Sequence, residues 1–97
     1  MNYYMVQFEM PEILDEKFVS LIPQNRSIVN QLLAKGRLKM YSLANDRSSI
    51  WAVVVAKDED DVLSLLDQLP LRPYLIPFIT ELAFHNSTEN IMAISLN

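Results

Sequence analysis

The residues best suited to chemistry in this chain of 97 are its single histidine and a short run rich in proline. His85 is the only side chain whose unperturbed pKa lies near neutrality, which makes it the natural candidate for a base. In the run QLPLRPYL at 68–75, Arg72 lies between two prolines that restrict the backbone. A guanidinium on a rigid loop is suited to bind an anion. His85 could equally cap a strand or contact another subunit, and Arg72 could be a solvated surface cation.

Several other kinds of chemistry are excluded or disfavoured by the composition. The chain has no cysteine, which excludes disulfides, thiolate metal sites and cysteine nucleophiles. One histidine argues against a histidine-based zinc site. The acidic run DEDD at 58–61 is better explained as a helix cap followed by an acidic first turn, because adjacent carboxylates on a helix point in different directions. We therefore expect neither a metal nor a cofactor.

The net charge and the apolar content limit the kinds of partner that we expect. The net charge is −4 and the eight basic residues are scattered, which argues against nucleic acid. The amino terminus lacks the features of a signal peptide, and no apolar run is long enough for a membrane span, so we expect a cytoplasmic protein. The length predicts one domain over residues 1–97. With 51% apolar residues and 21% charged ones, part of the apolar surface is expected to lie in a subunit interface.

The first two predicted elements are a strand at 3–10 and a helix at 15–35. The strand is largely apolar on both faces, which predicts that both faces are covered. Asp15 can cap the start of the helix, and Gly36, the only glycine, suits a left-handed C-cap. Pro23 either kinks this helix or opens a second one at its first turn.

Four further elements follow: strands at 37–44 and 49–56, a helix at 58–69 and a strand at 75–84. The turn residues NDRS join the first two of these as a hairpin. Pro70 ends the helix, since the residue before a proline is pushed out of helical geometry. Pro77 cannot donate to a ladder and should mark an edge strand or a bulge.

The order of these elements is β-α-β-β-α-β, which predicts a ferredoxin-like α+β fold with an antiparallel sheet and both helices on one face. The predicted core covers about 2–87, and the arm 88–97 could form a short strand or exchange between subunits. The other sheet face would be apolar, with Tyr3, Met5 and the run WAVVVA at 51–56. Two such sheets packed face to face would form a homodimer about a twofold axis.

The run LPLRPYL, the strand after it and the histidine in LAFHNS together resemble a signature of the muconolactone isomerase family. The helix in that family ends in a Leu-Pro-Leu-x-Pro-Tyr run, and a histidine follows the next strand. The likeness extends over roughly 2–87. It implies a dimeric α+β barrel that assembles into larger rings of dimers. It also implies a proton transfer, without metal or cofactor, on a small unsaturated lactone carboxylate.

The resemblance also bears on individual positions. Where the family has an acidic residue followed by a lysine on the first helix, this chain has Asn25 and Arg26. Asn25 cannot act as a base, and Arg26 can bind an anion but cannot shuttle protons. In the second strand, where the family shows tryptophan and arginine residues, this chain has Leu38, Lys39 and Leu43.

The resulting hypothesis is an isomerase-like protein that binds a small organic anion. We expect Arg26 and Lys39 to bind the carboxylate, with His85 or Tyr74 handling the proton; Tyr74 matches the family tyrosine. The alternative is a non-catalytic protein that binds a small metabolite or serves in an assembly. A third option, a monooxygenase that handles heme or a quinone on the same architecture, depends on His85 alone.

Three further residues complete the candidate binding site. Tyr41 and Trp51 could line an apolar pocket between the sheet and the helices, although aromatic residues on strands more often belong to the core. Arg72 would add a third cation, after Arg26 and Lys39, for binding the anion.

Overall fold

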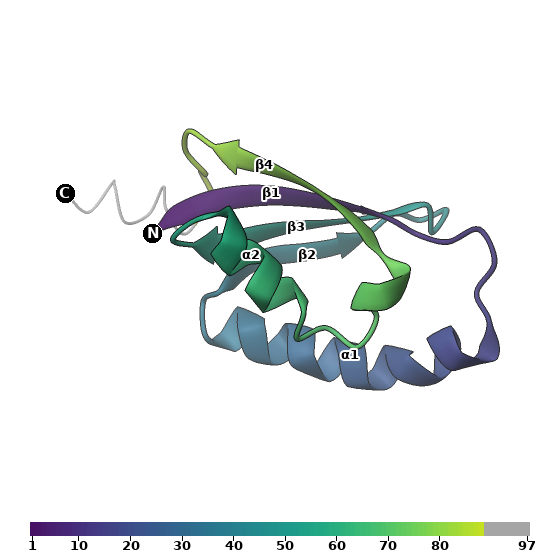
Figure 1. The fold of residues 1–97 in the computed structure, drawn as a ribbon. Helices are drawn as coiled ribbons and strands as arrows, with labels where there is room; N and C mark the ends of the chain where they lie inside the picture. Colours follow the sequence, from purple (N-terminus) through teal and green to yellow (C-terminus); the bar gives the residue numbers. More distant parts are fainter. Residues whose placement is uncertain (89–97) are drawn as a thin grey trace.

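The chain folds as a four-stranded antiparallel sheet with two helices on one face, as Figure 1 shows. The computed structural model describes residues 1–88. Its elements are β1 (Asn2–Glu9), α1 (Glu16–Ala34), β2 (Leu38–Leu43), β3 (Ser49–Ala56), α2 (Glu59–Leu66), the 3₁₀ helix η1 (Arg72–Tyr74) and β4 (Ile76–Leu82). The strand order β2-β3-β1-β4 confirms the predicted ferredoxin-like fold.

Helix α1 begins and ends where the sequence predicts. The Asp15 side chain accepts a hydrogen bond from the Phe18 N–H at 2.8 Å, and Gly36 adopts the left-handed conformation with φ of 74°. The helix runs through Pro23 without a break. Of the two alternatives for Pro23, the opening of a second helix is therefore wrong, because Pro23 lies within a single helix.

The hairpin of β2 and β3 turns at residues 44–47. The Ala44 carbonyl accepts a hydrogen bond from the Arg47 N–H at 2.9 Å, and the Asp46 carboxylate accepts one from the Ser48 N–H at 3.0 Å. Arg47 has a φ of 65°, in the left-handed region. Because a residue with a Cβ is strained there by about 1–2 kcal/mol, the turn holds Arg47 in an unfavourable backbone conformation.

Strand β2 contains an irregularity that the sequence does not reveal. Its pairing with β3 shifts in register between Leu38 and Met40. Beyond the shift Tyr41 lies opposite Ala52, which belongs to the core between sheet and helices. The irregularity therefore directs Tyr41 toward α1.

The second half of the chain follows the prediction with one shorter element. Asp58 caps α2 by accepting from the Asp61 N–H at 2.8 Å, but the helix ends at Leu66, three residues before the predicted end. Turns replace its last residues before Pro70. Strand β4 lies at the edge of the sheet, which confirms the edge position predicted from Pro77.

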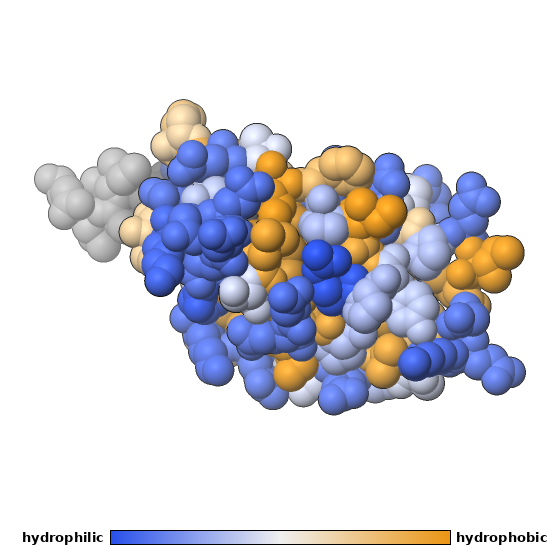
Figure 2. Space-filling view, viewed as in Figure 1, coloured by the Kyte–Doolittle hydropathy of each residue, from blue (hydrophilic) through white to orange (hydrophobic). Residues whose placement is uncertain are grey.

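Helices cover one face of the sheet, and the other face is open within residues 1–88 (Figure 1). Tyr4, Val6 and Phe8 of β1 are buried beneath the helices. The intervening residues of β1 face the other side, where no element of residues 1–88 covers the sheet. On β4, Ile76 and Phe78 are 59% and 53% exposed. Figure 2 shows apolar side chains that reach the surface between hydrophilic regions.

Two further points concern the chain as a whole. Within the described residues, no helix combines the length and the hydropathy that crossing a membrane requires. The strand or exchanged arm predicted around 91–96 lies outside the described residues.

Candidate functional site

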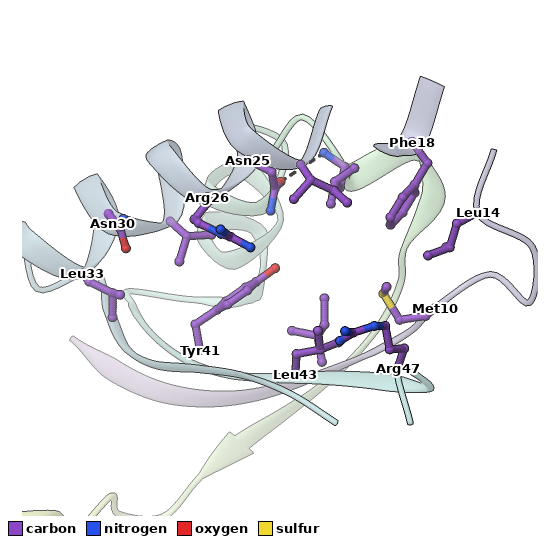
Figure 3. A pocket seen from close by; sticks show the side chains of 14 residues that line it. Met10, Leu14, Phe18, Asn25, Arg26, Asn30, Leu33, Tyr41, Leu43 and Arg47 are labelled. Atoms are coloured by element: carbon purple, nitrogen blue, oxygen red, sulfur yellow. Dashed lines mark hydrogen bonds between the residues drawn. The ribbon is translucent and has the colours of Figure 1, made fainter. Parts of the chain in front are cut away.

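A cavity of about 490 Å³ lies between α1 and the β2–β3 hairpin, on the helix side of the sheet. Figure 3 shows how the side chains of both elements enclose it. Its lining residues are Met10, Leu14, Phe18, Ile22, Asn25, Arg26, Val29, Asn30, Leu33, Tyr41, Leu43, Arg47, Ile50 and Leu71. Most of these are apolar, and the polar ones are few and grouped, which is the usual character of a small-molecule site.

Two cations face the cavity from opposite elements. Arg26 comes from α1 and Arg47 from the hairpin turn, and Figure 3 shows both guanidinium groups directed inward. Neither guanidinium has a hydrogen bond or ion pair with any residue in 1–88. The lining residues of the described chain include no aspartate or glutamate. The charged side chains of the described lining are therefore both cations.

Asn25 is the one buried polar residue of the described chain, at 4% exposure. It lies on the inner stripe of α1 with Phe18 and Val29. Its Oδ1 accepts a hydrogen bond from the Leu71 N–H at 3.1 Å, a buried contact between segments 46 residues apart. Because this bond fixes the carbonyl half of the amide, the amide nitrogen is turned toward the cavity, beside Tyr41 (Figure 3).

Tyr41 presents a buried hydroxyl with no hydrogen-bond partner in the described structure. Burial raises the pKa of Tyr41, and the neighbouring Asn25 side chain offsets part of that rise, although it forms no hydrogen bond with the hydroxyl here. The phenol is consequently protonated at neutral pH and available as a donor.

These groups together can recognise an anion with an apolar skeleton. Two guanidiniums supply charge-assisted donors, while the Asn25 amide and the Tyr41 hydroxyl supply neutral ones. Aspartate, glutamate, histidine and lysine are all missing from the lining set of residues 1–88. The described part of the cavity thus offers recognition and hydrogen-bond donation, but no side chain that acts as a base at neutral pH.

Of the seven residues predicted for the site, Arg26 and Tyr41 line this cavity. Lys39 is exposed at the irregularity of β2, with its Nζ beside Gly36. Trp51 pairs with Gln7 and alternates with the core residues of β3, so its side chain is on the open face of the sheet. The structure does not bring Lys39 or Trp51 into the cavity.

The other three predicted residues lie elsewhere. Arg72 donates from Nη1 to the Leu75 carbonyl at 3.1 Å and lies 3.7 Å from Asp67 through Nε. The Tyr74 ring packs edge-to-face on Phe18 with centroids 5.3 Å apart. His85 packs against Tyr3, 5.5 Å between ring centroids, and Tyr3 belongs to the open face. The roles predicted for Arg72, Tyr74 and His85 stay predictions.

Three polar residues of the cavity, Asn25, Asn30 and Arg47, were not predicted for the site. Asn25 was considered only as a position without a base, yet its spacing from Phe18, Val29 and Leu32 places a polar residue on the buried stripe of a helix. That pattern is a usable signal. Arg47 gives none, because the direction of a turn residue depends on a backbone conformation that the sequence does not specify.

The fold and the cavity together define a ferredoxin-like α+β protein with an apolar, cationic pocket between sheet and helix. The family model described as muconolactone delta-isomerase matches residues 2–88, so the chain belongs to that family, as the run LPLRPYL indicated. A solved crystal structure of muconolactone isomerase superposes with a TM-score of 0.70 at 20% identity, covering 89% of this chain and 93% of that one. No curated protein matches the sequence.

Proposed function

We propose that this protein binds a small organic carboxylate in the cavity between α1 and β2 and isomerises it by proton transfer. The observation that supports this proposal is the pair of inward-facing guanidiniums, Arg26 and Arg47, at a largely apolar cavity without a described carboxylate. Guanidinium groups bind carboxylates through charge-assisted hydrogen bonds. The apolar walls suit the carbon skeleton of such a ligand.

The proposed reaction needs no cofactor. A proton leaves a carbon near a carbonyl group, a proton is added to another carbon, and the double bond moves between them, so substrate and product are isomers. An unsaturated lactone carboxylate of the muconolactone type can react in this way. The base is the part of this chemistry that the lining residues do not supply. Of the two residues that the sequence suggests for it, Tyr74 packs on the lining residue Phe18, whereas His85 packs against Tyr3 on the open face.

A non-catalytic role on the same fold is the second candidate. It is favoured by the lack of any aspartate, glutamate, histidine or lysine in the described lining. Incubation with muconolactone in D₂O, followed by proton NMR, separates the two candidates. Deuterium incorporation above the buffer rate supports the isomerase. Ligand binding without exchange supports a protein that binds a small metabolite.

Two arginine variants test the carboxylate site itself. Arg26→Ala and Arg47→Gly should each weaken muconolactone binding by about tenfold, since each removes one charge-assisted contact. Arg47→Gly also relieves the left-handed strain at φ 65°, so its stability should be unchanged or higher. Weaker binding by an equally stable variant cannot be attributed to unfolding.

Lys39→Ala is the matched control for these variants. It removes one positive charge from an exposed side chain outside the cavity lining, so binding should stay close to wild type. If the arginine variants bind muconolactone as tightly as wild type does, the carboxylate site is not at this cavity.

We also propose that two copies of the chain pair through the open face of the sheet. The support for this pairing is the apolar surface on that face, where Ile76 and Phe78 are both more than half exposed. Phe78→Glu would place a charge in the interface and should convert the dimer to a monomer. Light scattering measures the mass, including that of any larger ring of dimers. A monomeric wild-type protein would contradict the pairing.

A further inference from the structure

The Asn25 side chain has one half that the fold explains and one half that it does not. An amide in the apolar stripe of a helix is costly unless it is hydrogen-bonded. The bond from the Leu71 N–H to Oδ1 accounts for the carbonyl half. The amide nitrogen faces the cavity beside the Tyr41 hydroxyl, with which it makes no hydrogen bond of ordinary geometry (Figure 3).

The Tyr41 hydroxyl is a second polar group of the cavity whose hydrogen bond the fold does not supply. It is buried, it has no partner in the described structure, and it points toward the neighbouring Asn25 amide (Figure 3). A buried hydroxyl without a partner is unfavourable by roughly 1–3 kcal/mol, so a group that restores its hydrogen bond gains affinity from that deficit.

The chemistry of Asn25 and Tyr41 determines which ligand group can bind between them. An amide nitrogen can only donate, and a protonated phenol can donate its one hydrogen. Two neutral donors that converge on one space are complementary to one acceptor with two lone pairs. A carbonyl oxygen meets this requirement and carries no charge that the surrounding apolar walls would have to compensate.

We propose that Asn25 and Tyr41 form a subsite for a carbonyl oxygen of the ligand, beside the carboxylate site at Arg26 and Arg47. The inference rests on the proposed binding of an organic carboxylate and narrows it to oxo acids and lactone acids. The Leu71 N–H has a positioning role, because it holds the Asn25 amide with its nitrogen toward the ligand. The two donors polarise the carbonyl bond and favour negative charge on its oxygen.

Two commercial acids of equal chain length and charge test the subsite. 4-Oxopentanoate carries a carbonyl group where pentanoate carries a methylene, and both carry one carboxylate. Wild-type protein should bind 4-oxopentanoate about fivefold more tightly than pentanoate, the difference expected for net hydrogen bonds to one neutral acceptor. The ¹³C resonance of the C4 carbonyl should move downfield on binding.

The variants assign this preference to the two donors. Tyr41→Phe keeps the ring and removes the hydroxyl, so the preference should shrink and the ¹³C shift should decrease while pentanoate binding is retained. Asn25→Asp keeps an acceptor for the Leu71 N–H but removes the amide donor, and it should also reduce the preference. Tyr3→Phe, which removes a hydroxyl on the open face of the sheet and outside the cavity lining, serves as the control.

The outcomes separate this subsite from the function on which it rests. If wild-type protein binds both acids equally, or if the preference survives in Tyr41→Phe and Asn25→Asp, the subsite is wrong and the carboxylate site stands. If neither acid binds at any concentration tested, the proposed function fails and the subsite fails with it.

Discussion

Replacing Asn25 by alanine should lower the free energy of unfolding, whereas replacing Tyr41 by phenylalanine should not, although both residues line the same cavity. Asn25→Ala removes the acceptor of the Leu71 N–H, a bond of 3.1 Å at a residue only 4% exposed. An unpaired buried N–H costs about 1–3 kcal/mol. Because Leu71 borders the cavity, water can partly replace the lost acceptor, so we expect a loss of about 1–2 kcal/mol.

Tyr41→Phe removes a hydroxyl that is buried without a partner, while the ring keeps its packing. Burying a polar group that makes no hydrogen bond is unfavourable. The free energy of unfolding should therefore stay the same or increase by up to about 1 kcal/mol. A residue whose polar atom lowers stability is the kind of residue that function retains at a binding site.

Urea denaturation at one fixed protein concentration, followed by circular dichroism, measures both changes as shifts of the midpoint at constant m-value. Asn30→Ala is the matched control, because it removes an exposed asparagine from the same helix and should change stability by less than about 0.5 kcal/mol. A loss of more than about 1 kcal/mol in Tyr41→Phe would show that the hydroxyl is hydrogen-bonded in the folded protein. That result would refute the reasoning behind the carbonyl subsite.

Three further predictions concern a turn, a salt bridge and the cavity. Gly36→Ala should lower the free energy of unfolding by about 1 kcal/mol, because φ is 74° there; an unchanged urea midpoint would contradict the strain argument. The Lys57 N–H, aided by Arg37, holds the pKa of Asp61 below its ordinary value of 3.8. The folded-state pKa is the lower one, so the stabilisation is present above about pH 4 and is lost as the pH falls through the folded-state pKa. The Tm difference between wild type and Asp61→Asn should therefore shrink on acidification, and a difference that persists in strong acid would disprove the linkage. Finally, Asn25→Asp should raise proton exchange on muconolactone in D₂O above the wild-type rate, since it adds a carboxylate to the cavity; a folded variant with no increase would argue against this cavity as the reaction site.

The sequence predicted the fold well because each element carries its own local signal. Asp15 and Asp58 cap the two helices as expected, and Gly36 adopts the left-handed conformation that its place after α1 predicted. The proline in β4 indicated an edge strand on physical grounds. The end of α2 was placed three residues too late, because the apolar spacing continues through Leu69 after the helical hydrogen bonds have given way to turns.

The site was predicted less completely because it depends on relations between elements. Tyr41 reaches the cavity through a register shift in β2, and Arg47 does so through a left-handed turn residue, neither of which is encoded in periodicity. His85 was singled out for its chemistry and for its match to a family histidine, and the structure places it against Tyr3 on the other side of the sheet. Residue type indicates which chemistry is available, whereas tertiary geometry decides which side chains meet.

The hydrogen bond between Asn25 and the Leu71 N–H has a spectroscopic consequence. When an acceptor binds the amide N–H of Asn25, electron density within the Asn25 amide shifts toward Oδ1. This shift strengthens the hydrogen bond that Oδ1 accepts from the Leu71 N–H. The Leu71 backbone resonance in a ¹H–¹⁵N spectrum should thus move downfield when the cavity fills, although Leu71 belongs to a different segment from the residues that hold the ligand. The proline-flanked loop would then carry an internal reporter of occupancy, readable without any label on the ligand.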